Sequence, residues 1–233
     1  MIRNTIFLLV FYFGLIFLLI LFIPSLVLPQ NIVILGGKFL GYWTKFCLKY
    51  IMATKIEVKG KENIVNNQKY FVVCTHQSIF ETFFLQTIFE NPVFILKKEL
   101  VRIPLFGWYL KKMGSISIDR NKISKENLKF SDEVSKVIKN TNKTLVIFPQ
   151  GTRKNFDDRS TFKKGFARIY NDLKIACLPV AVNSGRVWPK NSRLTSNQHI
   201  TVSILNIIPP GKEQNKFAFE VEQLIYNELN KIA

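Results

Sequence analysis

Tyr70-Phe-Val-Val-Cys-Thr-His-Gln-Ser-Ile-Phe-Glu81 passes from an apolar, β-branched run through a short polar turn into a helical pattern. The run Tyr70–Cys74 is typical of a buried strand. Ser78, followed three residues later by Glu81, forms a capping-box pattern that marks the start of a helix. A strand that leads directly into a helix is the repeating unit of α/β folds. This stretch therefore predicts an α/β domain.

The chain beyond residue 54 repeats the same alternation. Expected strands are Tyr70–Cys74, Val93–Leu96, Ser115–Ile118, Thr144–Phe148, Ile175–Val182 and His199–Ile208. Expected helices are Ile79–Phe89, Lys125–Lys139, Phe162–Asn171 and a last amphipathic one over about Glu213–Lys231. Such alternation predicts a mixed, mostly parallel sheet flanked by helices, with functional residues at the carboxyl ends of the strands. We expect residues 54–233 to form one domain.

Residues 1–53 differ from the rest in being strongly apolar, and we expect them to form a membrane anchor. The run from Ile6 to Ile23 carries no charge and is about long enough to span a hydrocarbon core. A signal peptide is the alternative, but its apolar region is shorter and ends at a small-x-small cleavage site. No good site of that kind follows Ile23, so we favour a retained helix.

A second apolar segment, about residues 31–53, is interrupted by lysines and reads as an interfacial amphipathic helix. It could pair with the first helix as a hairpin in one leaflet, or follow a full span as a surface helix. Lysines are abundant after the first helix and only Arg3 precedes it, which places the domain on the cytoplasmic side.

The charge of the chain favours anionic partners. Lysine and arginine number 33 against 16 acidic residues, for a formal net charge of +17. Nucleic acid, an anionic membrane surface and acidic carriers or cofactors all fit such an excess. The three cysteines are widely spaced and form neither a zinc pattern nor a disulfide framework, and with only two histidines a multi-histidine metal centre is not expected.

His76 and Glu81 are the first candidate catalytic pair. A histidine can accept a proton from an alcohol and return it to a leaving group. Five positions on a regular helix separate two side chains by about 140°. The pair can therefore meet only if His76 lies in the loop before the helix and Glu81 on its first turn. The alternative is structural: Glu81 only caps the helix and His76 only ends the strand.

Phe148-Pro-Gln-Gly-Thr-Arg153 is the second candidate motif, again directly after an expected strand. Gly151 permits a close backbone approach or a positive φ, and Arg153 can bind a phosphate through two hydrogen bonds. Lys97 and Arg120 also follow apolar runs and add positive charge. Considered alone, each of these residues fits an ordinary turn or a charged strand end better than a binding site.

In combination and in order, these motifs resemble the four sequence blocks of the glycerolipid acyltransferases of the PlsC type, which acylate lysophosphatidic acid. His76 to Glu81 resembles the His-x4-Asp block, and Lys97 to Arg120 resembles the second block. Phe148 to Arg153 resembles Phe-Pro-Glu-Gly-Thr-Arg, and Leu178 to Val182 resembles the apolar, proline-containing fourth block. The similarity spans about residues 54–210. Two positions depart from the pattern: Glu81 replaces an aspartate and Gln150 replaces a glutamate.

The resemblance implies an O-acyltransferase of phospholipid biosynthesis that transfers a fatty acyl group from acyl-CoA or acyl carrier protein to lysophosphatidic acid, giving phosphatidic acid. It implies His76 as the base, oriented by Glu81, with no metal or cofactor. The implied substrate-binding residues are Lys97, Arg120, Gln150, Gly151, Thr152 and Arg153. The implied location is a bacterial-type inner membrane, with an anionic membrane surface as a further partner and no nucleic acid.

Two alternatives remain open from the sequence. Gln150 leaves room for the same chemistry on another acceptor: lyso-ornithine lipid, another lysophospholipid or glycerol 3-phosphate. A protein of another class, a basic membrane-anchored binding protein, would instead show exposed aromatic residues among its basic ones, without His76, Glu81 and Arg153 gathered at one place.

Overall fold

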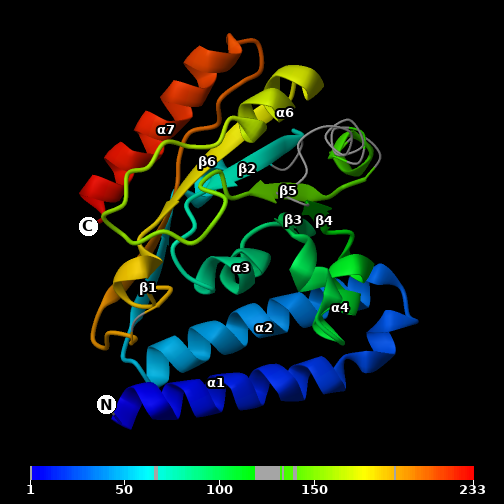
Figure 1. The fold of residues 1–233 in the computed structure, drawn as a ribbon, viewed down its shortest axis with the longest axis vertical. Helices are drawn as coiled ribbons and strands as arrows, with labels where there is room; N and C mark the ends of the chain where they lie inside the picture. Colours follow the sequence, from blue (N-terminus) through cyan, green and yellow to red (C-terminus); the bar gives the residue numbers. More distant parts are fainter. Residues whose placement is uncertain (1, 66–67, 119–131, 133, 139–140, 192) are drawn as a thin grey trace.

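The computed structural model describes residues 2–65, 68–118, 132, 134–138, 141–191 and 193–233, and its centre is a seven-stranded sheet in the order β1-β7-β6-β2-β5-β3-β4 (Figure 1). The strands are β1 (Lys55–Lys59), β2 (Tyr70–Cys74), β3 (Pro92–Lys97), β4 (Ile116–Ile118), β5 (Thr144–Ile147), β6 (Ala176–Val182) and β7 (His199–Ile204). The α-helices are α1 (Ile2–Leu21), α2 (Gln30–Tyr50), α3 (Phe80–Phe84), α4 (Phe106–Met113), α6 (Gly165–Leu173) and α7 (Gln214–Lys231). Short 3₁₀ helices are η1 (Ile23–Leu26), η2 (Lys61–Asn63), η3 (Leu85–Thr87), η4 (Lys98–Arg102) and η5 (Ser184–Arg186).

The sheet is mixed and mostly parallel, as the sequence predicted. Neighbouring strands pair in parallel except β6 and β7, which run antiparallel. β2 lies in the middle between β5 and β6, so the strand that carries His76 at its end is buried on both sides.

Two elements of the structure were not predicted, and one expected helix is shorter than predicted. The edge strand β1 was not predicted, because its alternating Lys55-Ile-Glu-Val-Lys59 pattern is charged and half exposed. Helix α4 was not predicted either, since its apolar stretch also fits plain core packing. The helix expected over Ile79–Phe89 is an α-helix only to Phe84 and continues as η3. The helix expected over Lys125–Lys139 falls largely outside the described residues.

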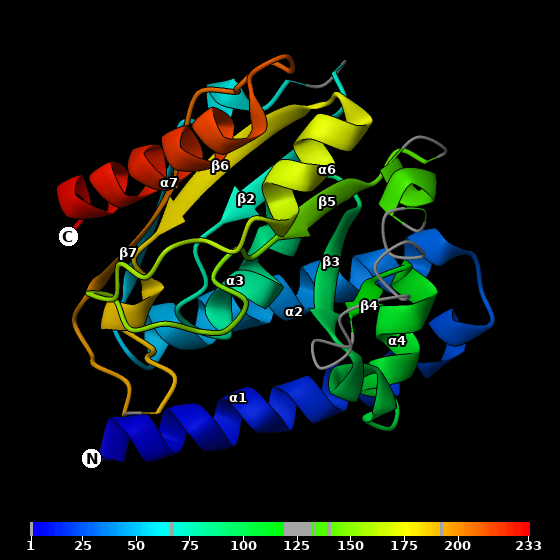
Figure 2. The same cartoon turned by 45° about the horizontal axis from the view of Figure 1, so that its top comes forward.

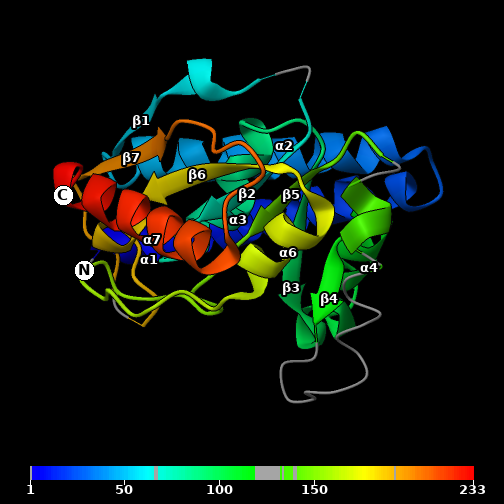
Figure 3. The ribbon, with the colours of Figure 1, turned by 90° about the horizontal axis from the view of Figure 1, so that it is seen from above.

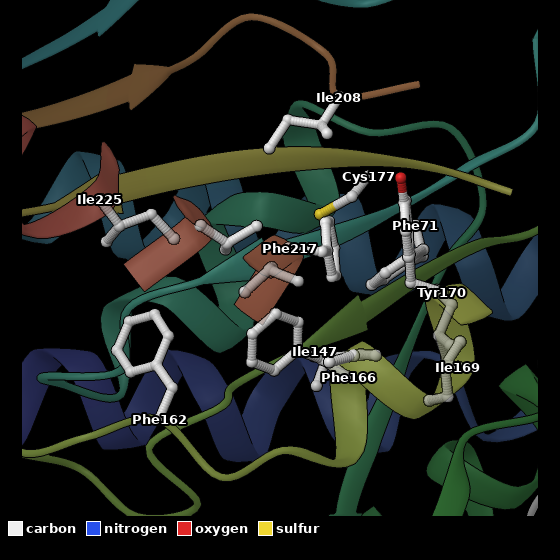
Figure 4. Close-up of a cluster of buried hydrophobic side chains, with 14 of the residues drawn as sticks. Phe71, Ile147, Phe162, Phe166, Ile169, Tyr170, Cys177, Ile208, Phe217 and Ile225 are labelled. Atoms are coloured by element: carbon white, nitrogen blue, oxygen red, sulfur yellow. The ribbon is translucent and has the colours of Figure 1, made fainter. Parts of the chain in front are cut away.

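Helices cover both faces of the sheet, because successive side chains of each buried strand point to opposite sides. On one face, Phe71 and Val73 of β2 pack with α6 and α7, and Figure 4 shows this cluster. On the other face, Val72 and Cys74 pack with residues of α1, α2 and α3. Figures 2 and 3 show α6 and α7 together on one side of the strands and α1 and α2 on the other.

The N-terminal helices α1 and α2 run antiparallel, side by side, joined by a turn that contains Pro24 and Pro29 (Figure 1). Helix α1 is long and apolar enough to cross a membrane, and most of its large side chains are exposed. Its buried residues are Phe7, Phe11 and Gly14. Among the described residues it is the one helix that meets this length and composition test; α2, with its lysines, does not.

Helix α2 lies between α1 and the sheet domain and packs closely through glycines. A Cβ at Gly14 of α1 would lie 2.1 Å from the Trp43 ring of α2. A Cβ at Gly41 of α2 would lie 2.7 Å from the backbone oxygen of Phe83 in α3. Only glycine permits these approaches, so the two N-terminal helices are packed onto the domain rather than separated from it.

Candidate active site

His76 lies in the short loop between β2 and α3, and Glu81 is the second residue of α3. This is the placement that lets the two side chains meet. His76 Nδ1 lies 3.6 Å from Glu81 Oε2, with the carboxylate fully buried and the imidazole mostly so. Nδ1 has no hydrogen-bond partner within normal distance, so Glu81 is the group that faces it.

Glu81 also holds the loop that precedes its own helix, so the catalytic and structural interpretations of this residue are compatible. Its carboxylate accepts hydrogen bonds from the backbone N–H groups of Gln77, at 3.1 Å, and Ser78, at 3.0 Å. The Ser78 hydroxyl accepts from the N–H of Phe80 at 2.8 Å. The bond from Ser78 N–H to Glu81 is one half of the predicted capping box, whereas the Ser78 hydroxyl accepts from Phe80 rather than from Glu81. Together these bonds hold the loop and keep Oε2 directed toward His76.

The second motif holds His76 from the opposite side. The Phe148 ring stacks on the imidazole, with 4.2 Å between ring centroids and 15° between planes. Gln150 Oε1 accepts from the backbone N–H of His76 at 2.7 Å, and the N–H of Lys154 donates to the His76 carbonyl at 2.8 Å. Gly151 lies in the turn between Gln150 and Lys154 and has a φ of +72°, a conformation that favours glycine. The two motifs therefore form one structural unit around a single histidine.

An apolar cavity of about 290 Å³ opens beside His76 and runs between the N-terminal helices and the domain. Its apolar lining comes from α1, α2, α3 and α4, from β3 and η4, and from Phe22 and Phe148. The lining residues with apolar side chains include Leu18, Leu19, Phe22, Val33, Leu40, Phe83, Phe94, Leu96, Phe106, Tyr109, Leu110 and Met113. Residues of α1 and α2 thus form part of the same cavity as the candidate base.

The polar end of this cavity is basic. His76, Thr152 and Arg153 line it together with Lys97 and Lys190. Lys190 Nζ donates to Thr152 Oγ1 at 3.4 Å. Arg120, the remaining expected cation, lies outside the described residues. A histidine next to several cations, in the lining of an apolar cavity, is suited to a ligand with an anionic head and a hydrocarbon chain.

Gln150 is the one described site candidate, besides Glu81, that does not line the cavity. It is buried, with 4% of its surface exposed, and its side chain carbonyl holds the backbone of His76. Cys74, just before the motif, is also buried. Burial, with a smaller contribution from the Glu81 charge, raises the pKa of the Cys74 thiol well above its usual range, which makes it a poor nucleophile.

Sequence reasoning missed two residues at this site. Lys190 follows Trp188 and Pro189 with no motif to mark it. Ser184 donates a hydrogen bond to Glu81 Oε1 from a loop that is far away in sequence. The only indication in the sequence was that Lys190 and Ser184 both follow the buried strand β6. The carboxyl end of this strand lies beside that of β2.

Comparison with known proteins identifies the family. A family model described as Acyltransferase matches residues 55–183, more than half of the chain. The chain belongs to the Acyltransferase family. The match covers β1 to the end of β6 and contains both motifs that surround His76.

Similar proteins include two named 1-acyl-sn-glycerol-3-phosphate acyltransferase. The one from Pseudomonas aeruginosa is 34% identical over 154 residues, which cover 64% of this chain and 58% of that protein. The one from Cocos nucifera is 30% identical over 193 residues, covering 81% and 61%. The chain thus spans about three fifths of the length of these relatives.

A solved structure shares the fold over nearly the whole length of both chains. It is the 1-acyl-sn-glycerophosphate (LPA) acyltransferase PlsC from Thermotoga maritima, with a TM-score of 0.79 and 21% sequence identity. The superposition covers 99% of this chain and 97% of that one. The mixed sheet and the N-terminal helices packed on it are therefore an architecture that the two proteins share.

Proposed function

We propose that this protein transfers a fatty acyl group from an acyl thioester to the free hydroxyl of lysophosphatidic acid, giving phosphatidic acid for phospholipid biosynthesis. The observation that carries the proposal is the position of His76. It faces Glu81 on one side and the basic end of an apolar cavity on the other. The names of the relatives point to the same acceptor.

In the proposed reaction, Glu81 holds the proton on His76 Nδ1, which leaves Nε2 free to act as the base. Nε2 accepts the proton of the acceptor hydroxyl while the hydroxyl oxygen attacks the thioester carbonyl carbon. The tetrahedral intermediate collapses with cleavage of the carbon–sulfur bond. The departing thiolate takes the proton back from His76, which returns to its starting state.

Arg153 and Lys97 bind the acceptor phosphate in this proposal, because they are the cations that the motifs supply to the polar end of the cavity. A guanidinium binds a phosphate through two parallel hydrogen bonds, whereas an ammonium acts as a point charge. Thr152 and Gly151 line the same end and shape it. Arg120 keeps the phosphate-binding role that the family resemblance gives it. Gln150 is assigned to holding the loop rather than to substrate.

The membrane proposal follows from α1, which is long and apolar enough to span a bilayer. We assign residues 1–53 to anchoring and residues 54–233 to the acyltransferase domain, on the cytoplasmic side of a bacterial-type inner membrane. The net charge of +17 suits an anionic membrane surface and an anionic donor, either acyl-CoA or acyl carrier protein. Because α1 and α2 also line the cavity, the anchor would place the lipid-binding site at the membrane.

The alternative of a basic binding protein predicts that the catalytic candidates lie apart. His76 and Arg153 instead line one cavity, and Glu81 faces His76 at 3.6 Å, which favours the enzyme. Acylation of another acceptor, whether lyso-ornithine lipid, another lysophospholipid or glycerol 3-phosphate, uses the same base and is distinguished by the choice of acceptor in the assay.

The experiment compares membranes that contain the wild-type chain or His76→Ala. Each is given labelled acyl-CoA or acylated carrier protein with lysophosphatidic acid, lyso-ornithine lipid or glycerol 3-phosphate. We expect labelled phosphatidic acid from the wild type and a loss of about 100-fold or more in the variant. Product formed only with another acceptor would show that lysophosphatidic acid is not the acceptor. Equal activity in His76→Ala and the wild type would refute the mechanism.

A further inference from the structure

Glu81 is a carboxylate with all of its surface buried, and its position depends on a small number of hydrogen bonds. Two come from backbone N–H groups of its own loop, at Gln77 and Ser78. The third comes from the hydroxyl of Ser184, which donates to Oε1. Among the described residues, Ser184 supplies the one hydrogen bond to this carboxylate from outside the loop that carries His76. The nearby ionisable groups are His76 itself and the buried Cys74.

Ser184 is itself held firmly by its neighbours. It begins η5, directly after β6, and is completely buried. Next to it, the N–H of Gly185 donates to Gln77 Oε1 at 2.9 Å, which fastens this loop to the histidine loop. On the other side, the Asn183 amide donates to the Ile232 carbonyl at 2.6 Å and its Oδ1 accepts from Thr201 N–H at 2.7 Å. The hydroxyl therefore approaches Glu81 from a fixed direction.

We propose that Ser184 is a positioning residue for acyl transfer: its hydroxyl holds Glu81 Oε1 so that Oε2 faces His76 Nδ1. This inference rests on the proposed function of His76 as the base. A glutamate has one more rotatable bond than the aspartate of the His-x4-Asp block that this segment resembles. The carboxylate of Glu81 therefore needs more restraint to stay in one orientation. Ser184 supplies that restraint from the neighbouring strand, and Ser184, Glu81 and His76 form a three-residue chain.

The kinetic test compares Ser184→Ala with a matched control, Ser203→Ala, in the full chain in membranes. Ser203 donates to Glu228 Oε1 at 2.6 Å and is also buried, so the control removes a similar serine–glutamate bond between β7 and α7. We expect Ser184→Ala to lower kcat about 10- to 100-fold, the usual effect of losing a hydrogen bond to a charged group, with KM values little changed. Ser203→Ala should retain wild-type kcat. Ser184→Thr, which keeps the hydroxyl, should recover most of the loss.

A spectroscopic test reads the imidazole directly and does not require turnover. The chain has only two histidines, so a His199→Gln background leaves His76 as the single imidazole in ¹⁵N spectra of the detergent-solubilised protein. We expect the wild type to show the tautomer protonated at Nδ1. Ser184→Ala should shift the ring signals toward a mixture of tautomers, and Ser203→Ala should leave them unchanged.

Unchanged His76 signals in folded Ser184→Ala, or an equal kcat loss in Ser203→Ala, would overturn the proposal. If Ser184→Ala does not fold, Ser184→Cys fills the space with a weaker donor, and it should give a smaller loss of kcat and a smaller spectral change in the same direction. If the wild type transfers no acyl group, the proposed function fails, while the spectra still decide whether Ser184 controls the imidazole.

Discussion

Replacing Gly37 with alanine should change which acyl chains the enzyme accepts. Gly37 of α2 and Gln86 of η3 both line the apolar cavity. A Cβ at residue 37 would lie 1.9 Å from Gln86 Oε1 and 3.5 Å from Met113 Cε. The first distance is far inside van der Waals contact, so the Gln86 side chain must move. Its amide donates to the Thr82 carbonyl at 3.0 Å, and moving it puts this bond at risk.

The displaced amide and the new methyl group occupy space in a cavity of about 290 Å³. Each methylene of a bound acyl chain that no longer fits in the cavity lowers the binding free energy by about 0.8 kcal/mol, which is a factor of about 4 in affinity. A loss of room for one or two methylenes therefore lowers kcat/KM for the longest chains about 4- to 15-fold. Short chains, which do not reach this part of the cavity, should be affected little.

The assay measures kcat/KM for acyl-CoA donors of increasing chain length, with lysophosphatidic acid held constant. Gly165→Ala is the matched control, because a Cβ at that position meets nothing within 4 Å. We expect Gly37→Ala to shift the preference toward shorter chains and Gly165→Ala to retain the wild-type preference. An unchanged chain-length profile in a folded Gly37→Ala protein would show that this cavity does not hold the acyl chain.

Three further predictions follow from the site. Arg153→Ala should raise KM for the acceptor and lower kcat/KM about 10- to 100-fold. Arg153→Lys keeps the positive charge and should recover part of this loss. An unchanged KM for the acceptor would exclude a contact between Arg153 and the phosphate. Glu81→Gln should lower kcat at least about 100-fold, because one orientation of the amide directs its NH₂ at the N–H of Ser78 and the other directs it at the N–H of Gln77. Near-normal turnover would contradict the orienting role. Burial raises the pKa of the Cys74 and Cys177 thiols well above their usual range, so both thiols stay protonated at about pH 8. They should resist labelling by maleimide until the protein is denatured. Rapid labelling of these two cysteines in the native protein would contradict their burial.

The sequence predicted the parts of the site that local patterns determine. An apolar run, a polar turn and a capping box were enough to place His76 in a loop and Glu81 on the first turn of a helix. The strand-end positions of both motifs predicted that they meet at one edge of a parallel sheet. These features depend on residues a few positions apart, where periodicity and capping are informative.

The parts that were not predicted depend on contacts between distant segments. Nothing near Ser184 indicates that its hydroxyl reaches Glu81, because the contact exists only once β6 pairs with β2. The edge strand β1 is defined by its pairing with β7 rather than by an apolar pattern. Hydropathy marked residues 1–53 as apolar, but it cannot reveal that side chains of α1 and α2 line the cavity beside His76.

The packing of α1 has a consequence for the order in which the protein acquires its structure. Phe7 and Phe11 lie edge-on against Trp188, with ring centroids 5.1 and 5.0 Å apart, and Asn4 Oδ1 accepts from the N–H of Leu194 at 3.0 Å. Helix α1 is synthesised early, but residues such as Trp188 and Leu194 that pack against it are synthesised much later. Contacts of such long sequence separation form slowly, because a long loop must close first. Until then the apolar surface of α1 lacks its protein partners, and contact with the bilayer during synthesis would protect this segment from aggregation while the sheet assembles.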